Sequence, residues 1–221
     1  MKGFWKSSVG KKLIMSLSGI FLMLFLLMHL SINLTMLIDP IKGDAYNKAA
    51  HFMASNPIIK VIEPILVIGF VFHILYSFVV QLNNWKARGN SRYAEFDQNK
   101  SSSWASRNMI WLGIFIFGFL VLHIANFTIK IKFGNVPQTP EGIDDTFKLV
   151  VSLFDIWWYD VIYIISFIAL GLHLHHAFWS ALQTIGLNNS KWMKRLQIIG
   201  DVYTYIIVIG FTLIPLYFLI F

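Results

Sequence analysis

The feature that most constrains this chain is a recurring apolar run of about 20 residues or more, long enough to cross a bilayer as a helix. We predict such spans at about 13–38, 58–83, 107–131, 157–183 and 197–221. Charged residues make up only 13% of the 221 residues, whereas a soluble domain carries roughly 25%. Too few polar side chains remain to cover a globule in water. The predicted fold is therefore an all-α integral membrane bundle of five transmembrane helices, with residues 1–221 as one domain.

Basic residues are divided unevenly between the two sides of this bundle. Twelve lie before the first span or in the second and fourth connections: Lys2, Lys6, Lys11, Lys12, Lys86, Arg88, Arg92, Lys100, Arg107, Lys191, Lys194 and Arg195. Six lie on the other side: Lys42, Lys48, Lys60, Lys130, Lys132 and Lys148. Because cytoplasmic connections are richer in lysine and arginine, we expect a cytoplasmic N-terminus and an outer C-terminus. The basic residues form no continuous face, which argues against nucleic-acid binding.

Two of the outer connections mix apolar and polar residues in the manner of short surface helices. These are 44–55 (DAYNKAAHFMAS) and 144–153 (DDTFKLVVSL). We expect Asp144 to cap the second helix, because aspartate is a favoured N-cap residue. Both would lie on the outer surface as lids over the bundle.

Histidine is the residue that points to a function. Six of the seven histidines fall inside predicted spans, where ionisable groups are costly and usually functional. His29, His73, His123 and His173 each lie about 15 residues into their helix, or roughly 22 Å along it. Because successive helices run in opposite directions, His29 and His123 fall in the outer half of the membrane and His73 and His173 in the inner half. The depths of the two pairs differ by something on the order of 10 Å.

Facing histidines in an apolar bundle can ligate a haem iron from both sides, which leaves no open site for oxygen and suits electron transfer. The chain has no cysteine, which excludes thiolate-bound clusters and covalently attached haem. We therefore expect two haems, one per pair, approached through small residues at Gly19, Gly69, Gly113, Gly118 and Gly171.

Structural histidines, a transition-metal site or a proton relay in a haem-free transporter are the alternatives. A metal site would gather its ligands at one depth, and a relay usually includes more buried carboxylates than Glu63 and Asp160. Spacing alone leaves His176 as an alternative to His173.

Three segments carry a resemblance to a known family: FLLMHLSINL at 25–34, YNKAAHFMASNP at 46–57 and GLHLHHAFWSALQTIGL at 171–187. Through these segments the chain resembles a known membrane-anchor subunit, the di-haem cytochrome b of succinate dehydrogenase and fumarate reductase. The type that it resembles is the five-helix b558 type. The resemblance implies that His29 and His123 bind the outer haem b and that His73 and His173 bind the inner one. It favours His173 over His176 as the ligand, and leaves His175 and His176 to line the bundle or contact a haem edge.

The same resemblance implies the partners and the location. Such anchors sit in the bacterial cytoplasmic membrane and dock a flavoprotein and an iron–sulfur subunit on its cytoplasmic side. They pass electrons between the iron–sulfur subunit and a quinone, usually menaquinone, while succinate chemistry belongs to the partners. Some members carry a glutamate two residues before the span-four ligand, where this chain has Gly171; glycine favours succinate oxidation. A di-haem anchor of a hydrogenase or formate dehydrogenase is the alternative within redox chemistry.

A quinone needs hydrogen-bonding groups beside the outer haem. The candidates on that side are His51, Asn33, Asp39 and Glu63. His51 is the only histidine outside a span and belongs to the matching segment 46–57. The alternative role for His51 is that of a solvated loop residue or a contact to a haem propionate.

Overall fold

In the computed structural model, residues 7–88, 104–187 and 189–221 are described. Their long helices are α1 (Ser8–Asn33), α3 (Pro57–Arg88), α6 (Met109–His123), α9 (Trp157–Thr184) and α10 (Ser190–Ile220). After α6 the chain continues through a π-helical segment, η3 (Ile124–Thr128), into α7 (Ile129–Phe133). Five spans of 25 to 30 residues in this part of the chain are long and apolar enough to cross a membrane. The five-helix, all-α prediction is confirmed for the described residues, none of which forms a strand.

The first and last helices begin earlier than the predicted spans at 13 and 197. Side-chain caps explain the difference, because the Ser7 hydroxyl accepts from the Gly10 N–H at 3.0 Å and the Asn189 carbonyl accepts from the Trp192 N–H at 2.9 Å. An N-cap satisfies a backbone donor that would otherwise lack a partner. Both helices therefore start in polar sequence and take up basic residues before they become apolar. Lys2, Lys6 and the connection 89–103, with Arg92 and Lys100, lie outside the described residues.

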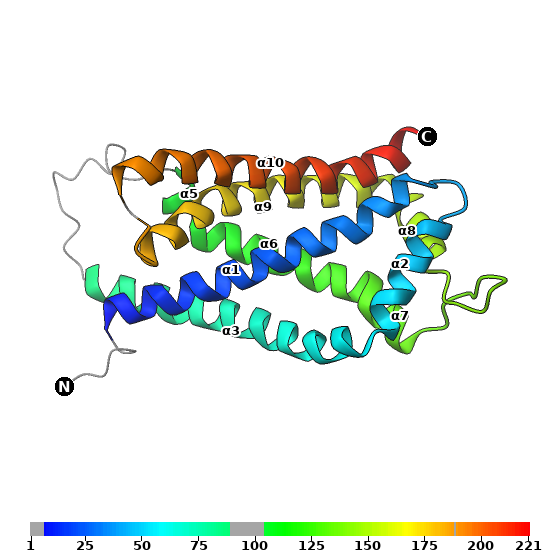
Figure 1. Cartoon of the computed structure of the whole chain (residues 1–221), viewed down its shortest axis with the longest axis horizontal. Helices are drawn as coiled ribbons and strands as arrows, with labels where there is room; N and C mark the ends of the chain where they lie inside the picture. Colours follow the sequence, from blue (N-terminus) through cyan, green and yellow to red (C-terminus); the bar gives the residue numbers. More distant parts are fainter. Residues whose placement is uncertain (1–6, 89–103, 188) are drawn as a thin grey trace.

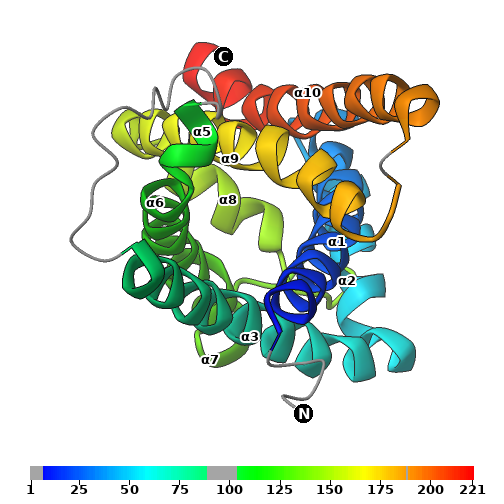
Figure 2. The same ribbon diagram turned by 90° about the vertical axis from the view of Figure 1, so that its left-hand side faces the viewer.

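Four of the long helices form a ring, and the fifth lies outside it (Figure 2). Around the ring α1 contacts α3, α3 contacts α6 with its continuation, α6 contacts α9, and α9 contacts α1. α10 packs along α9 and touches α1. In this order α1 stands diagonally across from α6, and α3 stands diagonally across from α9. Side chains from two diagonal helices meet only if they reach into the centre of the ring.

Glycine explains how closely α10 approaches its neighbours. A Cβ added at Gly171 would lie 2.5 Å from Val208 Cγ2, and one at Gly210 would lie 2.8 Å from the Leu30 methyl groups. A Cβ at Gly69, on α3, would lie 2.6 Å from the Phe21 ring. Small residues let membrane helices pack backbone to backbone. Gly69 and Gly171 therefore serve helix packing in this structure, rather than facing open space.

Two short helices close the end of the bundle opposite to the start of α1 (Figure 1). They are α2 (Asp44–Ser55) and α8 (Thr146–Phe154), joined to the bundle by turns and by the 3₁₀ segment η2 (Leu34–Leu37). Both predicted surface helices are present. The predicted cap is wrong: Asp145, not Asp144, caps α8 by accepting from the Lys148 N–H at 3.2 Å. Asp144 instead pairs through its backbone with Gln138 across the preceding loop.

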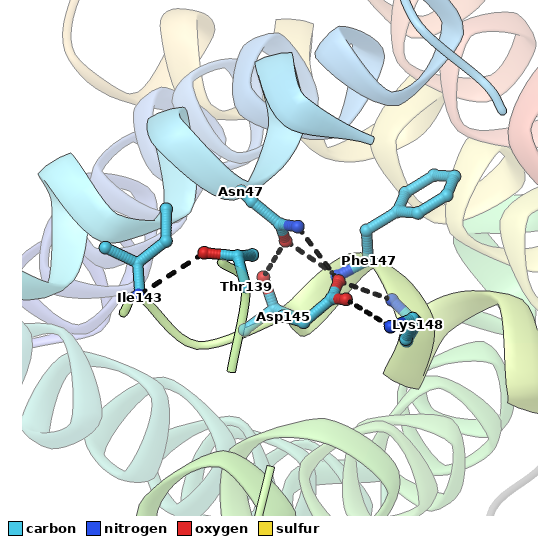
Figure 3. Close-up of polar contacts among 7 residues, drawn as sticks. Asn47, Thr139, Ile143, Asp145, Phe147 and Lys148 are labelled. Carbon is cyan, nitrogen blue, oxygen red and sulfur yellow. Dashed lines mark hydrogen bonds and ion pairs between the residues drawn. The ribbon is translucent and has the colours of Figure 1, made fainter. Parts of the chain in front are cut away.

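Asn47 holds the two short helices together (Figure 3). Its amide donates to Asp145 Oδ1 at 2.9 Å, and its carbonyl accepts from the Thr146 hydroxyl at 3.1 Å and the Phe147 N–H at 2.9 Å. Only 2% of Asn47 is exposed. Burial raises the pKa of Asp145, but the bonds from Asn47 and Lys148 outweigh it and keep this pKa below its usual value. Gly43, at φ 72°, turns the chain into α2 directly against Phe147.

We expect Asn47→Ala to loosen this end of the bundle. The substitution leaves the Phe147 N–H without its buried partner and removes one of the hydrogen bonds to Asp145, which costs about 2–3 kcal/mol. Thermal melting of the purified protein and faster hydrogen exchange in 44–55 and 146–154 would show the loss. Asn56→Ala is the matched control, because that side chain caps α3 at its half-exposed end by accepting from the Ile58 N–H. Equal destabilisation by the two variants would contradict the role assigned to Asn47.

Candidate functional site

His29 and His123 meet in the centre of the ring from the diagonal helices α1 and α6. Their ring centres lie 5.8 Å apart, and the ring planes are nearly perpendicular, at 86°. Aromatic side chains surround the pair, with Phe25 stacked on His29 at 5.3 Å and Phe119 and Phe127 beside His123 at 5.8 and 5.2 Å. The result is two neighbouring imidazole rings inside a mainly aromatic shell, and we call them the outer pair after the side of the membrane on which they are expected.

His73 and His173 come from the other diagonal of the ring, α3 and α9, and we treat them as the second pair, without the direct ring contact that joins His29 and His123. The two side chains are close enough to interact electrostatically. The ring of His73 lies against α1, where a Cβ added at Gly19 would be 3.8 Å from its Cε1 atom. Both diagonals of the bundle therefore carry one histidine pair.

A hydrogen bond fixes which nitrogen of His73 is free. The Ser18 hydroxyl donates its single hydrogen to the Met15 carbonyl at 2.9 Å, so it acts as an acceptor toward His73 Nδ1, 3.0 Å away. With the Ser18 hydrogen on the Met15 carbonyl, Nδ1 of His73 carries the proton. The lone pair is left on Nε2, which is the tautomer that binds a metal through Nε2, and such an outer hydrogen bond is the usual support of a ligating histidine.

The two pairs lie at different depths in the bundle. Ser18 marks the level of the His73 pair on α1, and His29 lies eleven residues further along the same helix. At 1.5 Å per residue the two levels are roughly 16 Å apart. No group of three or more His, Cys, Asp or Glu side chains that could share one metal ion is found among the described residues. The histidines are thus arranged as two separate pairs, and not as one multi-ligand centre.

The residues of the outer pair fit a haem between them. An imidazole nitrogen lies about 2 Å from the metal that it binds, so two axial imidazoles on one iron have ring centres roughly 6 Å apart. His29 and His123 already stand at that separation. A Cβ added at Gly113 or Gly118, on the same helix as His123, would meet no atom within 4 Å, but Gly118 is exposed, so its open space lies on the outside of the bundle. The donor set, two neutral imidazoles in an aromatic shell, is one that holds haem iron.

The other span-four histidines are engaged at the edge of the bundle. His175 Nε2 lies 3.1 Å from Asp201 Oδ1 on α10, and both side chains are about half exposed. His176 packs against Trp179, with ring centres 5.9 Å apart. His173 has an electrostatic interaction with His73 on α3 and is half-buried.

The four quinone candidates all lie toward the end of the bundle that α2 and α8 close, but they do not form one site. His51 is exposed on α2, and Glu63 on α3 forms an ion pair with Lys132 of α7. Asp39 accepts from the Lys42 N–H at 3.2 Å within its own turn. Asn33 donates to the His29 carbonyl at 2.8 Å, which places its amide beside the His29 ring. Asn33 alone among them contacts a histidine of the outer pair.

Sequence reasoning missed three buried polar residues beside the outer pair: Asn126, Asp160 and Tyr163. The sequence shows that Asp160 is a carboxylate within a span, but it does not show that this side chain is buried. Asn126 and Tyr163 carry no signal of their own, because single polar residues are frequent near helix ends. What distinguishes them is the set of atoms around them, and only the folded chain supplies that information.

No protein-family model matches the chain, and neither a curated protein nor a solved structure matches it. The arrangement of the side chains and the sequence segments that resemble the di-haem anchors are therefore the features that support a function.

Proposed function

We propose that the chain is the membrane-anchor cytochrome b subunit of a succinate:quinone oxidoreductase. In this role it binds two b haems, one between His29 and His123 and one between His73 and His173, and carries electrons between an iron–sulfur subunit and a quinone. The observation that supports the proposal most strongly is the approach of the His29 and His123 rings to 5.8 Å from helices that are diagonal in the bundle. Apolar packing alone gives no reason for two histidines to face each other there.

A bound haem supplies reversible one-electron exchange at its iron. The chain determines the conditions of that exchange. Two histidines would hold each haem iron and would leave no position on it for oxygen. Ser18 holds His73 with its Nδ1 protonated and its Nε2 free. Phe25, Phe119 and Phe127 keep water away from the outer pair.

The direction across the membrane follows from the charge distribution in this proposal. The excess of lysine and arginine at the end where α1 begins is expected on the cytoplasmic side. The inner pair is the nearer one to that end. Flavoprotein and iron–sulfur subunits would dock there, in a bacterial cytoplasmic membrane, and electrons from succinate would pass from the inner pair to the outer pair and on to menaquinone.

Gly171 bears on the direction of flow. A Cβ at this position would collide with Val208, so the position can hold a glutamate only if α10 moves away from α9. A proton route through a carboxylate at this point is therefore incompatible with the observed packing of α9 and α10. We propose the succinate-oxidising direction, in which electron transfer does not require a carboxylate at position 171.

The proposal can be tested in membranes that contain the chain together with its flavoprotein and iron–sulfur partners. Anaerobic succinate should reduce a b-type absorption, and fumarate should reoxidise it. Deleting this chain should release succinate dehydrogenase activity into the soluble fraction. A b-type absorption that succinate leaves unchanged, or dehydrogenase that stays on membranes lacking the chain, would refute the proposal.

A further inference from the structure

Three polar side chains are buried beside the outer histidine pair with hydrogen bonds left unmade. Asn126 is 7% exposed, Tyr163 is 2% exposed and Asp160 is fully buried. The Asn126 Nδ2 atom, the Tyr163 hydroxyl and both carboxyl oxygens of Asp160 are buried without a partner in good hydrogen-bonding geometry, and Asn126 and Tyr163 lie close enough to interact with each other. Each such group costs about 1–3 kcal/mol when it is buried unsatisfied. Four unmet atoms in one region indicate a binding site whose ligand supplies the missing partners.

The three residues converge from two helices. Asp160 and Tyr163 lie one turn apart on α9 and share a face. Asn126 lies three residues after His123 in the π-helical segment, a backbone form that is frequent at functional sites. The Asn126 side chain is the neighbour of the Tyr163 hydroxyl. The Tyr163 ring lies 6.1 Å from the His123 ring, whose Nδ1 also lacks a partner.

Aromatic rings form the walls of this polar cluster. Phe119 and Phe154 meet Tyr163 edge to face at 4.9 and 5.2 Å, and Phe127 does so at 6.3 Å. Phe154 comes from α8, so the cluster lies directly beneath that helix at the outer end of the bundle. Hydrogen-bonding groups inside aromatic walls suit a flat ring that carries oxygen atoms, and the membrane depth requires that this ring be lipid-soluble.

We propose that Asn126, Asp160 and Tyr163 hold the head group of a quinone next to the outer histidine pair. The inference rests on the proposed function, which requires a quinone as substrate. The Asn126 amide and the Tyr163 hydroxyl donate to a ring carbonyl oxygen, and the Asp160 carboxyl group binds the oxygen of the oxidised or reduced ring as donor or acceptor. We favour this site over His51, which is exposed, and over Glu63, which is paired with Lys132, while Asn33 remains beside His29.

The test is equilibrium dialysis of 2,3-dimethyl-1,4-naphthoquinone, which has no isoprenoid tail, against the purified full chain in detergent. Asn126→Leu, Asp160→Leu and Tyr163→Phe should each raise the Kd about tenfold or more, as expected when one hydrogen bond of about 1.4 kcal/mol is lost. Thr204→Val is the matched control, because Thr204 on α10 is another buried hydroxyl without a partner. Its Kd should equal that of the unmodified chain. Melting of every variant shows whether the fold is kept.

Several results would overturn the site. Unchanged quinone binding in all three variants would overturn it. Loss of binding in His51→Ala alone would also overturn it, because that result would place the head group on the outer surface. Loss of the outer haem in the same variants would assign the cluster to the haem instead. Haem per chain, measured on the same samples, separates the two proposals: two haems with unaltered quinone binding reject this site only, and absence of haem rejects the proposed function.

Discussion

Alanine at His73 and alanine at His173 are expected to abolish the same b-type component, while alanine at His29 or His123 abolishes the other. In the proposed arrangement each substitution would remove one of the two imidazoles that hold one iron. The other pair is roughly 16 Å away along α1, so its haem should be retained. Reduced-minus-oxidised difference spectra of the four purified variants would show two groups of two.

Two controls sharpen this prediction. His175→Ala should keep both haems, because His175 faces Asp201 at the edge of the bundle. Ser18→Ala should weaken the inner haem alone, because Ser18 holds the tautomer of His73, and loss of such an outer hydrogen bond typically costs 10- to 100-fold in metal affinity. If the His73 and His123 variants lost the same spectral component, the pairing proposed here would be wrong.

Glutamate at Gly171 is expected to prevent stable folding, and even alanine should lower the melting temperature. The added Cβ would stand 2.5 Å from Val208 Cγ2, and valine has little rotamer freedom in a helix with which to withdraw. Overpacking of this kind costs about 1–3 kcal/mol, more than the roughly 1 kcal/mol that alanine gains over glycine in helix propensity. A glutamate adds the larger cost of burying a carboxyl group without a partner.

A double-mutant cycle isolates that contact. Val208→Ala removes the methyl group that the new Cβ would strike, so Gly171→Ala combined with Val208→Ala should be less destabilised than the sum of the single variants. Tryptophan fluorescence suits the melting measurement, because the chain has 8 tryptophans and no cysteine for a thiol-reactive dye. Strict additivity of the two substitutions would show that the close approach of α9 and α10 does not determine stability at this point.

Much of the fold could be predicted because its signals are local. The five spans follow from hydrophobic length, and 44–55 was expected as a surface helix from its mixed composition. Helix starts at Ser8 and Ser190 were missed, because caps extend each helix into polar sequence that a hydropathy argument discards. The choice of Asp145 over Asp144 as the cap of α8 depends on Asn47, about a hundred residues away.

The candidate site could likewise be predicted only in part. His29 and His123 lie equally far along the first and third spans, which run in the same direction, so counting residues places them level, and the structure brings their rings together. That they bind haem stays a prediction. The polar cluster could not be derived this way. A π-helical segment at 124–128 has no clear sequence signature, and an unmet hydrogen bond at Tyr163 is a property of its neighbours. For the same tertiary reason, the ion pair between Glu63 and Lys132 was not foreseen.

The most direct test of the central claim is a count of haem per chain, combined with a reduced-minus-oxidised visible spectrum of the detergent-purified protein. Two low-spin b haems per chain are predicted, one for each histidine pair. Folded protein that contains no haem, from cells that supply haem in excess, would contradict the cytochrome proposal and would favour a haem-free transporter.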